Sequence, residues 1–134
     1  MSDTGSLRVE APRVLVVDDG ALVRMYYRGI LERAGFVVDE ALNGIEGLER
    51  VLGATYDLLV VDVNMPKMDG YSFLRAVRGR EPPIRSIPSL MTSTEAADGD
   101  REAARVAGAN FYLVKPLSED VLVAHARALV GSCP

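Results

Sequence analysis

The stretch Leu58-Leu59-Val60-Val61-Asp62 places four consecutive apolar residues directly before an acidic one. A short, continuous apolar run of this kind is typical of a strand buried on both faces, as in a parallel sheet that helices cover. Asp62 then stands where the strand ends and a loop begins. In parallel α/β sheets, ligands and chemistry gather at the carboxyl ends of the strands. Asp62 is therefore the first candidate functional residue.

A second apolar run, from Val14 to Val17, also ends in acids, Asp18 and Asp19. Because the carboxyl ends of parallel strands lie at one edge of the sheet, we expect these carboxylates to lie near Asp62. Three carboxylates at one point repel each other unless a cation is bound there. Hard divalent cations such as Mg²⁺ bind carboxylate and carbonyl oxygens, so the pattern predicts a metal site. Taken alone, the pair could instead cap the helix that follows.

Short apolar runs alternate with amphipathic stretches along the rest of the chain. We predict strands at about residues 14–17, 37–41, 58–61, 89–91 and 111–114, and helices at about 21–34, 45–52, 71–77, 100–107 and 119–130. Five strand–helix units of this kind predict an α/β fold with one parallel sheet between two layers of helices.

The ends of several predicted helices carry capping signals. Glycine follows four of them, at positions 35, 53, 79 and 108, where a left-handed cap suits glycine. Ser118 is placed to cap the last helix at its N-terminus. Because glycine interrupts the segment 95–100, we expect the helix there to begin late or to be mobile.

Two further polar residues follow predicted strands at the same edge as the acids. Thr92 follows residues 89–91, and Lys115 follows residues 111–114. Lys115 could neutralise part of the acidic charge, and the hydroxyl of Thr92 could donate to an oxygen bound near Asp62. Alone, the lysine could be a surface charge and the threonine an ordinary strand residue. Pro116 raises the chance that the bond before it is cis.

Composition excludes several classes of function. The 134 residues carry a formal net charge of −4 with scattered basic residues, which argues against a nucleic-acid-binding surface. The densest basic group, Arg75, Arg78, Arg80 and Arg85, is expected to form a solvated helix face and loop.

The chain also lacks signals for export. Cys133 is the only cysteine, so an internal disulfide cannot form and a reducing cytoplasm is the expected compartment. No apolar stretch approaches the roughly 20 residues needed to span a membrane. We expect residues 1–12 to be a flexible leader before a single domain.

Together these motifs resemble the receiver domains of two-component response regulators. The resemblance rests on Val16-Val17-Asp18-Asp19, the stretch from Val61 to Gly70, Thr92 and Lys115-Pro116, in the family's order and close to its spacing. It covers about residues 13–130 and implies a receiver domain over residues 13–134. The implied fold is doubly wound (βα)5, flavodoxin-like, with a five-stranded parallel sheet in the order 2-1-3-4-5.

The resemblance assigns roles to the acidic residues by matching position. Asp62 resembles the family's phospho-accepting aspartate. Asp19 resembles the main side-chain ligand of Mg²⁺ or Mn²⁺, and Asp18 assists it. Asn64 would offer its backbone carbonyl to the same metal ion.

The resemblance also assigns a switch. Thr92 and Lys115 match the hydroxyl and ammonium groups that bind the phosphoryl oxygens, and Ser93 could share the role of the hydroxyl. Tyr112 matches the aromatic residue whose rotamer reports the state, although alone it could be a core or interface aromatic.

The implied function is that of a regulatory phosphoacceptor rather than an enzyme. Asp62 would take a phosphoryl group from a sensor histidine kinase or a histidine phosphotransfer protein. The face formed by residues 100–107, 111–114 and 119–130 would then change and control a downstream protein target. The protein is expected to be a monomer or a phosphorylation-dependent dimer that binds neither nucleic acid nor membranes.

Other interpretations stay open from the sequence. A haloacid-dehalogenase-type phosphatase also uses an aspartate at a strand end with Mg²⁺, but it needs an acid where this chain has Asn64. A flavodoxin-like redox module would bind phosphate after the first strand, where Asp18 and Asp19 would repel it. The chain could also be a degenerate receiver that serves only for interaction. It is expected to be a stand-alone receiver, although it could be a fragment of a larger regulator.

Overall fold

The computed structural model describes residues 11–130. Strands and helices alternate in this region, in the order β2 (Arg13–Val17), α2 (Ala21–Arg33), β3 (Val37–Ala41), α3 (Gly44–Gly53), β4 (Leu58–Asp62), α4 (Gly70–Arg78), the 3₁₀ turn η1 (Ile84–Ser86), β5 (Ser89–Ser93), α5 (Asp98–Ala107), β6 (Phe111–Val114) and α6 (Glu119–Val130). Most of the predicted leader, and Cys133, lie outside the described residues. Within them, no helix has the length and apolar character needed to cross a membrane.

The five strands form one parallel sheet in the order β3-β2-β4-β5-β6. Numbered along the chain, this is the order 2-1-3-4-5, so the predicted fold is confirmed. The order reverses direction between β2 and β4, which lie side by side at the centre of the sheet. The loops that follow these two strands therefore open into one crevice at the carboxyl edge, the usual ligand position in doubly wound folds.

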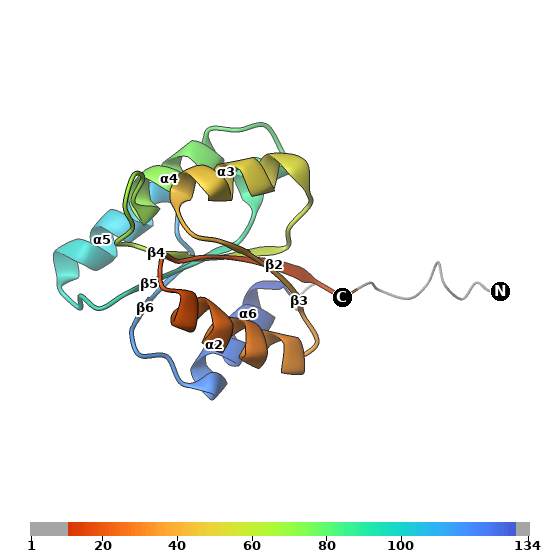
Figure 1. Cartoon of the computed structure of the whole chain (residues 1–134). Helices are drawn as coiled ribbons and strands as arrows, with labels where there is room; N and C mark the ends of the chain where they lie inside the picture. Colours follow the sequence, from red (N-terminus) through yellow and green to blue (C-terminus); the bar gives the residue numbers. More distant parts are fainter. Residues whose placement is uncertain (1–10, 131–134) are drawn as a thin grey trace.

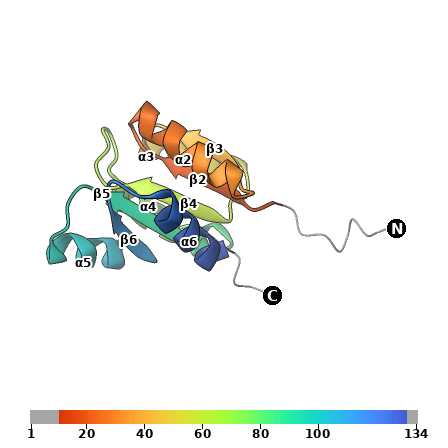
Figure 2. The same ribbon diagram turned by 90° about the horizontal axis from the view of Figure 1, so that it is seen from below.

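Helices cover both faces of the sheet, with α2 and α6 on one face and α3, α4 and α5 on the other (Figures 1 and 2). Successive residues of the central strands point to opposite faces. Leu15 and Leu59 pack on the side of α3 and α4, whereas Val14 and Leu58 pack on the side of α2 and α6. All four side chains are fully buried. This explains why the central strands are continuous apolar runs rather than alternating ones.

Several predicted element ends differ from the structure. The strands β4 and β5 extend to Asp62 and Ser93, so Asp62 and Thr92 lie within the sheet rather than after it. The late start expected for the helix near residue 100 is wrong, because α5 already begins at Asp98. Asp98 and Asp100 both lie in its first turn, where acidic side chains interact favourably with the helix dipole and offset the cost of glycine.

The capping predictions are partly right. Gly35 and Gly108 adopt φ angles of 100° and 108°, as a left-handed cap requires. Gly53 is instead the last residue of α3, and Gly79 has a right-handed φ of −86°, so the prediction is wrong for both. The hydroxyl of Ser118 accepts a hydrogen bond of 3.2 Å from the Val121 amide, which confirms it as an N-terminal cap of α6.

Arg78 corrects the expectation of a solvated basic face. This half-buried side chain makes five hydrogen bonds to groups on the neighbouring segments: two to the carbonyl of Gly108, one each to the carbonyls of Arg85 and Ile87, and one to the hydroxyl of Ser89. Burial lowers its pKa. Arg78 therefore joins the end of α4 to η1, to the start of β5 and to the end of α5.

Candidate functional site

Asp62 is the last residue of β4 and is only 5% exposed. Its neighbour in β5 is Thr92, and the amide of Val63 donates to the Thr92 carbonyl at 2.9 Å. The start of α4 lies directly against it, because the Gly70 amide donates to the Val63 carbonyl at 2.8 Å. A Cβ atom on Gly70 would collide with the Asp62 carbonyl oxygen, so the close return of the chain requires glycine here.

Asp18 and Asp19 lie in the loop between β2 and α2, in different environments. Asp18 is buried, with 2% of its surface exposed, and its Oδ1 accepts a hydrogen bond of 2.8 Å from the Gly20 amide. Its own amide donates to the Ala41 carbonyl of β3 at 3.1 Å, which continues the sheet by one residue. Asp19 is exposed. The first acid is therefore held in place, while the second faces solvent.

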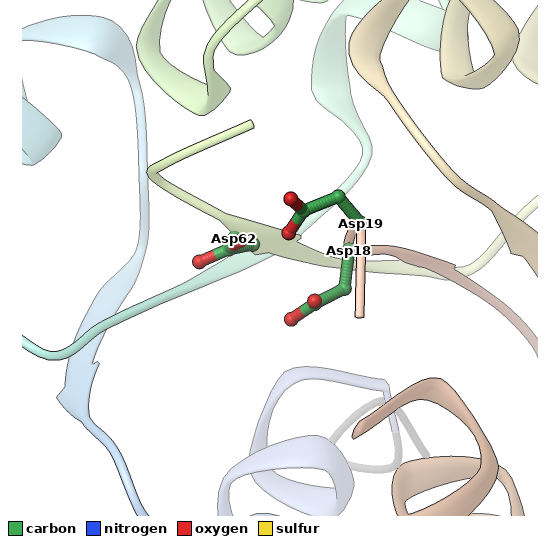
Figure 3. Close-up of side chains that lie close together, drawn as sticks. All are labelled: Asp18, Asp19 and Asp62. Atoms are coloured by element: carbon green, nitrogen blue, oxygen red, sulfur yellow. The ribbon is translucent and has the colours of Figure 1, made fainter. Parts of the chain in front are cut away.

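The structure brings these three acids together, as predicted. One carboxylate oxygen from each of Asp18, Asp19 and Asp62 lies within 4.8 Å of the others. Figure 3 shows the three side chains close together at the ends of β2 and β4. Three negative charges at this separation repel each other strongly unless cations compensate them.

Lys115 supplies one of the compensating charges. Its Nζ lies 2.9 Å from Oδ2 of Asp18 and 3.1 Å from Oδ1 of Asp62. The lysine follows β6, whose neighbour β5 holds the Lys115 amide through the carbonyl of Ser93 at 2.7 Å. The peptide bond between Lys115 and Pro116 is cis. A lysine 97 residues from Asp18 in the sequence thus bridges the ends of both central strands.

Burial and charge shift the pKa values of this group. Burial, and then the charge of Asp18, raise the pKa of Asp62 from 3.8 to about 6, although Lys115 lowers it. For Lys115, burial opposes the charged form, but its contacts with Asp18 and Asp62 outweigh this and raise the pKa. At neutral pH the lysine is therefore charged. Asp62 is also ionised, although its surroundings disfavour the negative charge.

The hydroxyl of Thr92 is buried beside Asp62. Thr92 is fully buried, and among the described residues its Oγ1 is the one buried side-chain oxygen or nitrogen without a hydrogen-bond partner. A buried hydroxyl without a partner is unfavourable, so an acceptor arriving next to it would be bound strongly. The hydroxyl of Ser93, by contrast, has a hydrogen-bond partner, because its oxygen accepts a hydrogen bond of 3.0 Å from the Glu95 amide.

Two predicted residues lie apart from the acids. Asn64 is exposed, two residues after Asp62 in the loop that leads to α4. Tyr112 lies in β6, and its hydroxyl donates at 2.7 Å to the carbonyl of Glu95 in the loop after β5. The guanidinium of Arg101 lies 5.3 Å from the centre of its ring. Tyr112 therefore contacts the loop that follows Thr92 and the helix α5, but not the acid cluster.

One neighbour of the site was not predicted. Tyr27 of α2 is buried, with 2% of its surface exposed. Burial raises its pKa to about 12, and smaller effects come from the charge of Lys115, which lowers this pKa, and from that of Asp18, which raises it. The Tyr27 hydroxyl does not form a hydrogen bond of normal geometry with Thr92. Helical periodicity identifies the buried face of α2, but it does not show which residues surround the hydroxyl of Tyr27.

The residues present fit a divalent metal ion. The ligand atoms available are carboxylate oxygens, which Mg²⁺ and Mn²⁺ prefer. Lys115 contacts Asp18 and Asp62, whereas no salt bridge involves Asp19 among the described residues. One positive charge for three acids leaves a net negative site that faces solvent on the side of Asp19. Such a site suits a small, hydrated divalent cation.

The chain matches a known family. The family model for the response regulator receiver domain matches residues 14–127. Among curated proteins, the chain is 39% identical over 128 residues to the transcriptional regulatory protein PrrA of Mycobacterium leprae, which covers 96% of this chain and 52% of that protein. The chain thus spans about half the length of this regulator.

Solved structures give the same result. The chemotaxis protein CheY4 of Vibrio cholerae is 33% identical with a TM-score of 0.83, and the match covers 90% of this chain and 99% of that one. The receiver domain of the sensor histidine kinase PA1611 from Pseudomonas aeruginosa is 30% identical with a TM-score of 0.84, covering 91% and 99%. That structure has a magnesium ion coordinated in its active site cleft.

Proposed function

The chain belongs to the family of response regulator receiver domains, and from this we propose that it acts as a phospho-accepting switch in a two-component system. Asp62 accepts the phosphoryl group. The observation that carries the proposal is the environment of this carboxylate: it is buried, it lies beside two further acids, and Lys115 contacts it at 3.1 Å. A partner that bears a phosphohistidine, either a sensor histidine kinase or a phosphotransfer protein, is the donor.

The transfer forms one bond and breaks another. An Asp62 carboxylate oxygen attacks the phosphorus atom, the phosphorus–nitrogen bond breaks, and its electron pair returns to the imidazole of the donor. Carboxylate nucleophiles form acyl phosphates in this way. Lys115 is placed to contact the phosphoryl oxygens as charge develops on them.

Asp18, Asp19, Asp62 and the backbone carbonyl of Asn64 would hold Mg²⁺ or Mn²⁺. When bound, the ion neutralises charge on the incoming phosphoryl group and orients it. The chain's own contribution is to hold Asp18 rigidly, through Gly20 and Lys115, while Asp19 remains free to bind the ion. This division is supported by the different burial of the two acids.

Phosphorylation would act on the structure through Thr92. The new group carries nearly two negative charges and three acceptor oxygens. The unpartnered hydroxyl of Thr92 can bind one of these oxygens only when the group is present. Such a contact, made in one state alone, is what shifts an equilibrium between two conformations. Tyr112 follows, because its hydroxyl is bonded to Glu95 in the loop after Thr92.

The output face we propose consists of α5, β6 and α6, which adjoin this loop. It carries exposed apolar side chains, among them Val106, Phe111 and Val121. A downstream protein target would bind here, or a second copy of the chain after phosphorylation. The negative net charge and the site's chemistry favour a protein partner over a nucleic acid.

The phosphoacceptor role is tested by intact-mass measurement after incubation with Mg²⁺ and acetyl phosphate. We expect a single added phosphoryl group that is lost in alkali, and none when EDTA replaces Mg²⁺. The control is Asp62→Asn, which keeps the size of the side chain but removes the nucleophile. An equal alkali-labile label on this variant would contradict the assignment. Repeated turnover of a generic phosphoester by the wild type would indicate a phosphatase instead.

The switch role of Thr92 needs a different measurement. Thr92→Ala should still accept the phosphoryl group but lose most of the conformational response, because it has no hydroxyl to bind the new oxygen. The response is measured as amide chemical-shift changes in α5 and β6 on phosphorylation. Ser93→Ala is the matched control and should keep the response, since that hydroxyl is bonded to the Glu95 amide. A full response in Thr92→Ala would reject the role.

A further inference from the structure

The turn that carries Asp18 and Asp19 lacks the usual cap. The residue that precedes α2 is Gly20, which has no side chain to accept a hydrogen bond from the helix, and no acidic residue lies in the first helical turn. Both features leave a helix N-terminus less well held than a Ser, Thr or Asp cap would. Yet this turn must present two carboxylates to the site.

Arg24, from the second turn of α2, holds this segment instead. Its amide donates to the Gly20 carbonyl at 2.9 Å, and its side chain returns to donate from Nη1 to the Asp18 carbonyl at 2.6 Å. The short distance is typical of a hydrogen bond from a charged donor. With this bond, every polar group of Asp18 has a partner: its amide bonds Ala41, its carbonyl bonds Arg24, and its two carboxylate oxygens bond Gly20 and Lys115.

The guanidinium is itself held by a second contact. Its Nε donates to Oε1 of Glu40, in β3, at 2.9 Å, and Arg28 donates to the other oxygen of Glu40 at 2.6 Å. The Arg24 side chain is 16% exposed, and that of Glu40 is 28% exposed. A planar guanidinium can make two directed bonds at once, whereas a lysine ammonium cannot span the same two acceptors in that geometry.

We propose that Arg24 is a positioning residue of the phosphorylation site: fixed by Glu40, it fastens the Asp18 carbonyl and so orients the acid pair for divalent-metal binding. This inference rests on the proposed function, because it assumes that Asp18 and Asp19 bind the ion. Residues that orient metal ligands contribute strongly to metal affinity. Arg24 touches the backbone of a ligand rather than a ligand oxygen, so its effect should be smaller than that of the ligands themselves.

The test compares two substitutions that conserve charge. Arg24→Lys keeps the positive charge near the site but loses the two-point bridge, whereas Arg28→Lys changes the same residue type on the same helix and leaves Asp18 untouched. We expect the dissociation constant for Mg²⁺ to rise about fivefold in Arg24→Lys and less than twofold in Arg28→Lys. Glu40→Asp, which withdraws the carboxylate that fixes Arg24, should fall between them.

The chain has no tryptophan, so binding is followed by the amide chemical shifts of Asp18, Asp19 and Gly20 during an Mg²⁺ titration. Thermal unfolding without metal checks that the variants remain folded to a similar extent. In Arg24→Lys these three amides should also shift before any metal is added, which a purely stabilising ion pair would not produce.

The outcomes separate the inference from the function on which it rests. If the wild type shows no Mg²⁺-dependent shift at Asp19, the metal-binding role proposed for this site is wrong. If the wild type binds Mg²⁺ but Arg24→Lys and Arg28→Lys bind it equally well, the site functions without Arg24 and only the inference fails. A weaker affinity that matches the loss of thermal stability in both variants would also overturn it.

Discussion

The carboxylate of Asp62 carries an unfavourable negative charge. It lies in a buried position next to Asp18, and Lys115 compensates both acids with one positive charge. The result is a pKa of about 6 rather than 3.8. Ionised Asp62 is therefore an anion that the fold tolerates at a cost, and binding a cation would lower that cost.

This cost predicts how Asp62→Asn depends on pH. Because the pKa of Asp62 is raised on folding, its contribution to stability is fully present below about pH 4 and is lost as the pH rises through 6. The asparagine side chain cannot ionise. In EDTA, Asp62→Asn should therefore be more stable than the wild type by about 2–3 kcal/mol at pH 7.5, with no gain at pH 4. Urea unfolding at the two pH values measures this.

The low-pH measurement serves as the control, since the wild-type side chain is then protonated and close to asparagine in shape. An equal difference at both pH values would mean that packing, and not ionisation, sets the effect. A variant less stable than the wild type at pH 7.5 would contradict the raised pKa.

Helices and strands contribute to the site mainly by where they end. The carboxyl ends of β2 and β4 carry the acids, β5 carries Thr92, and Lys115 follows β6. On the opposite side of the sheet from α2, the ends of α4 and α5 are joined by Arg78 rather than by apolar packing alone. This places a buried polar link behind the proposed output face.

Arg78→Met should therefore destabilise the protein. Methionine replaces the apolar stem, but the carbonyl of Gly108 loses both of its hydrogen bonds, and the Ile87 carbonyl and Ser89 hydroxyl keep only the bond of 3.1 Å to each other. The unpaired carbonyl and the lost bonds from a charged donor cost roughly 2–4 kcal/mol in total. The free energy of unfolding in urea measures the loss. Arg75→Met, on the exposed face of the same helix, is the matched control and should change it by less than about 0.5 kcal/mol.

A loss in Arg78→Met no larger than in Arg75→Met would show that water replaces the arginine without cost. Arg78→Lys distinguishes charge from geometry, because one ammonium cannot reach all of these acceptors. It should recover only part of the lost stability.

At the scale of the whole molecule, the proposed metal binding would be linked to folding. The acids come from the loop after β2 and from the end of β4, and Asp18 and Asp62 lie 44 residues apart in the sequence, so the unfolded chain has no comparable site. An ion that binds only the folded state stabilises it by an amount set by its concentration relative to its dissociation constant. At ten times that constant, the gain is about 1.4 kcal/mol, enough to raise the unfolding temperature by several degrees.

We therefore expect Mg²⁺ to raise the unfolding temperature of the wild type in a scan by differential scanning fluorimetry. Asp19→Asn should abolish most of this rise, since it removes the exposed acid that is free to bind the ion. Potassium chloride at matched ionic strength controls for general screening of the acidic surface. An equal rise with potassium chloride would argue against a specific site.

Much of this molecule could be read from local patterns in the chain. The apolar runs predicted the parallel strands, and strand ends share an edge in such a sheet, so Asp18, Asp19, Asp62, Thr92 and Lys115 were placed together correctly. These residues lie together because the order of the strands brings their carboxyl ends to one edge, and this can be predicted without knowing the side-chain conformations. Left-handed caps were predicted less well, because glycine after a helix permits such a cap without requiring it.

The contacts of Arg24, Tyr27 and Arg78 could not be predicted in this way. Arg24 and Arg78 each join a helix to groups at least six residues away, and the surroundings of all three side chains depend on how the helix is rotated and how far it lies from its neighbours. An arginine in an amphipathic helix has the same local pattern whether it faces solvent or a carbonyl. Only the packing of the helix decides whether such an arginine faces solvent or a carbonyl, because the hydrogen bond forms only when the acceptor lies within about 3 Å of the donor.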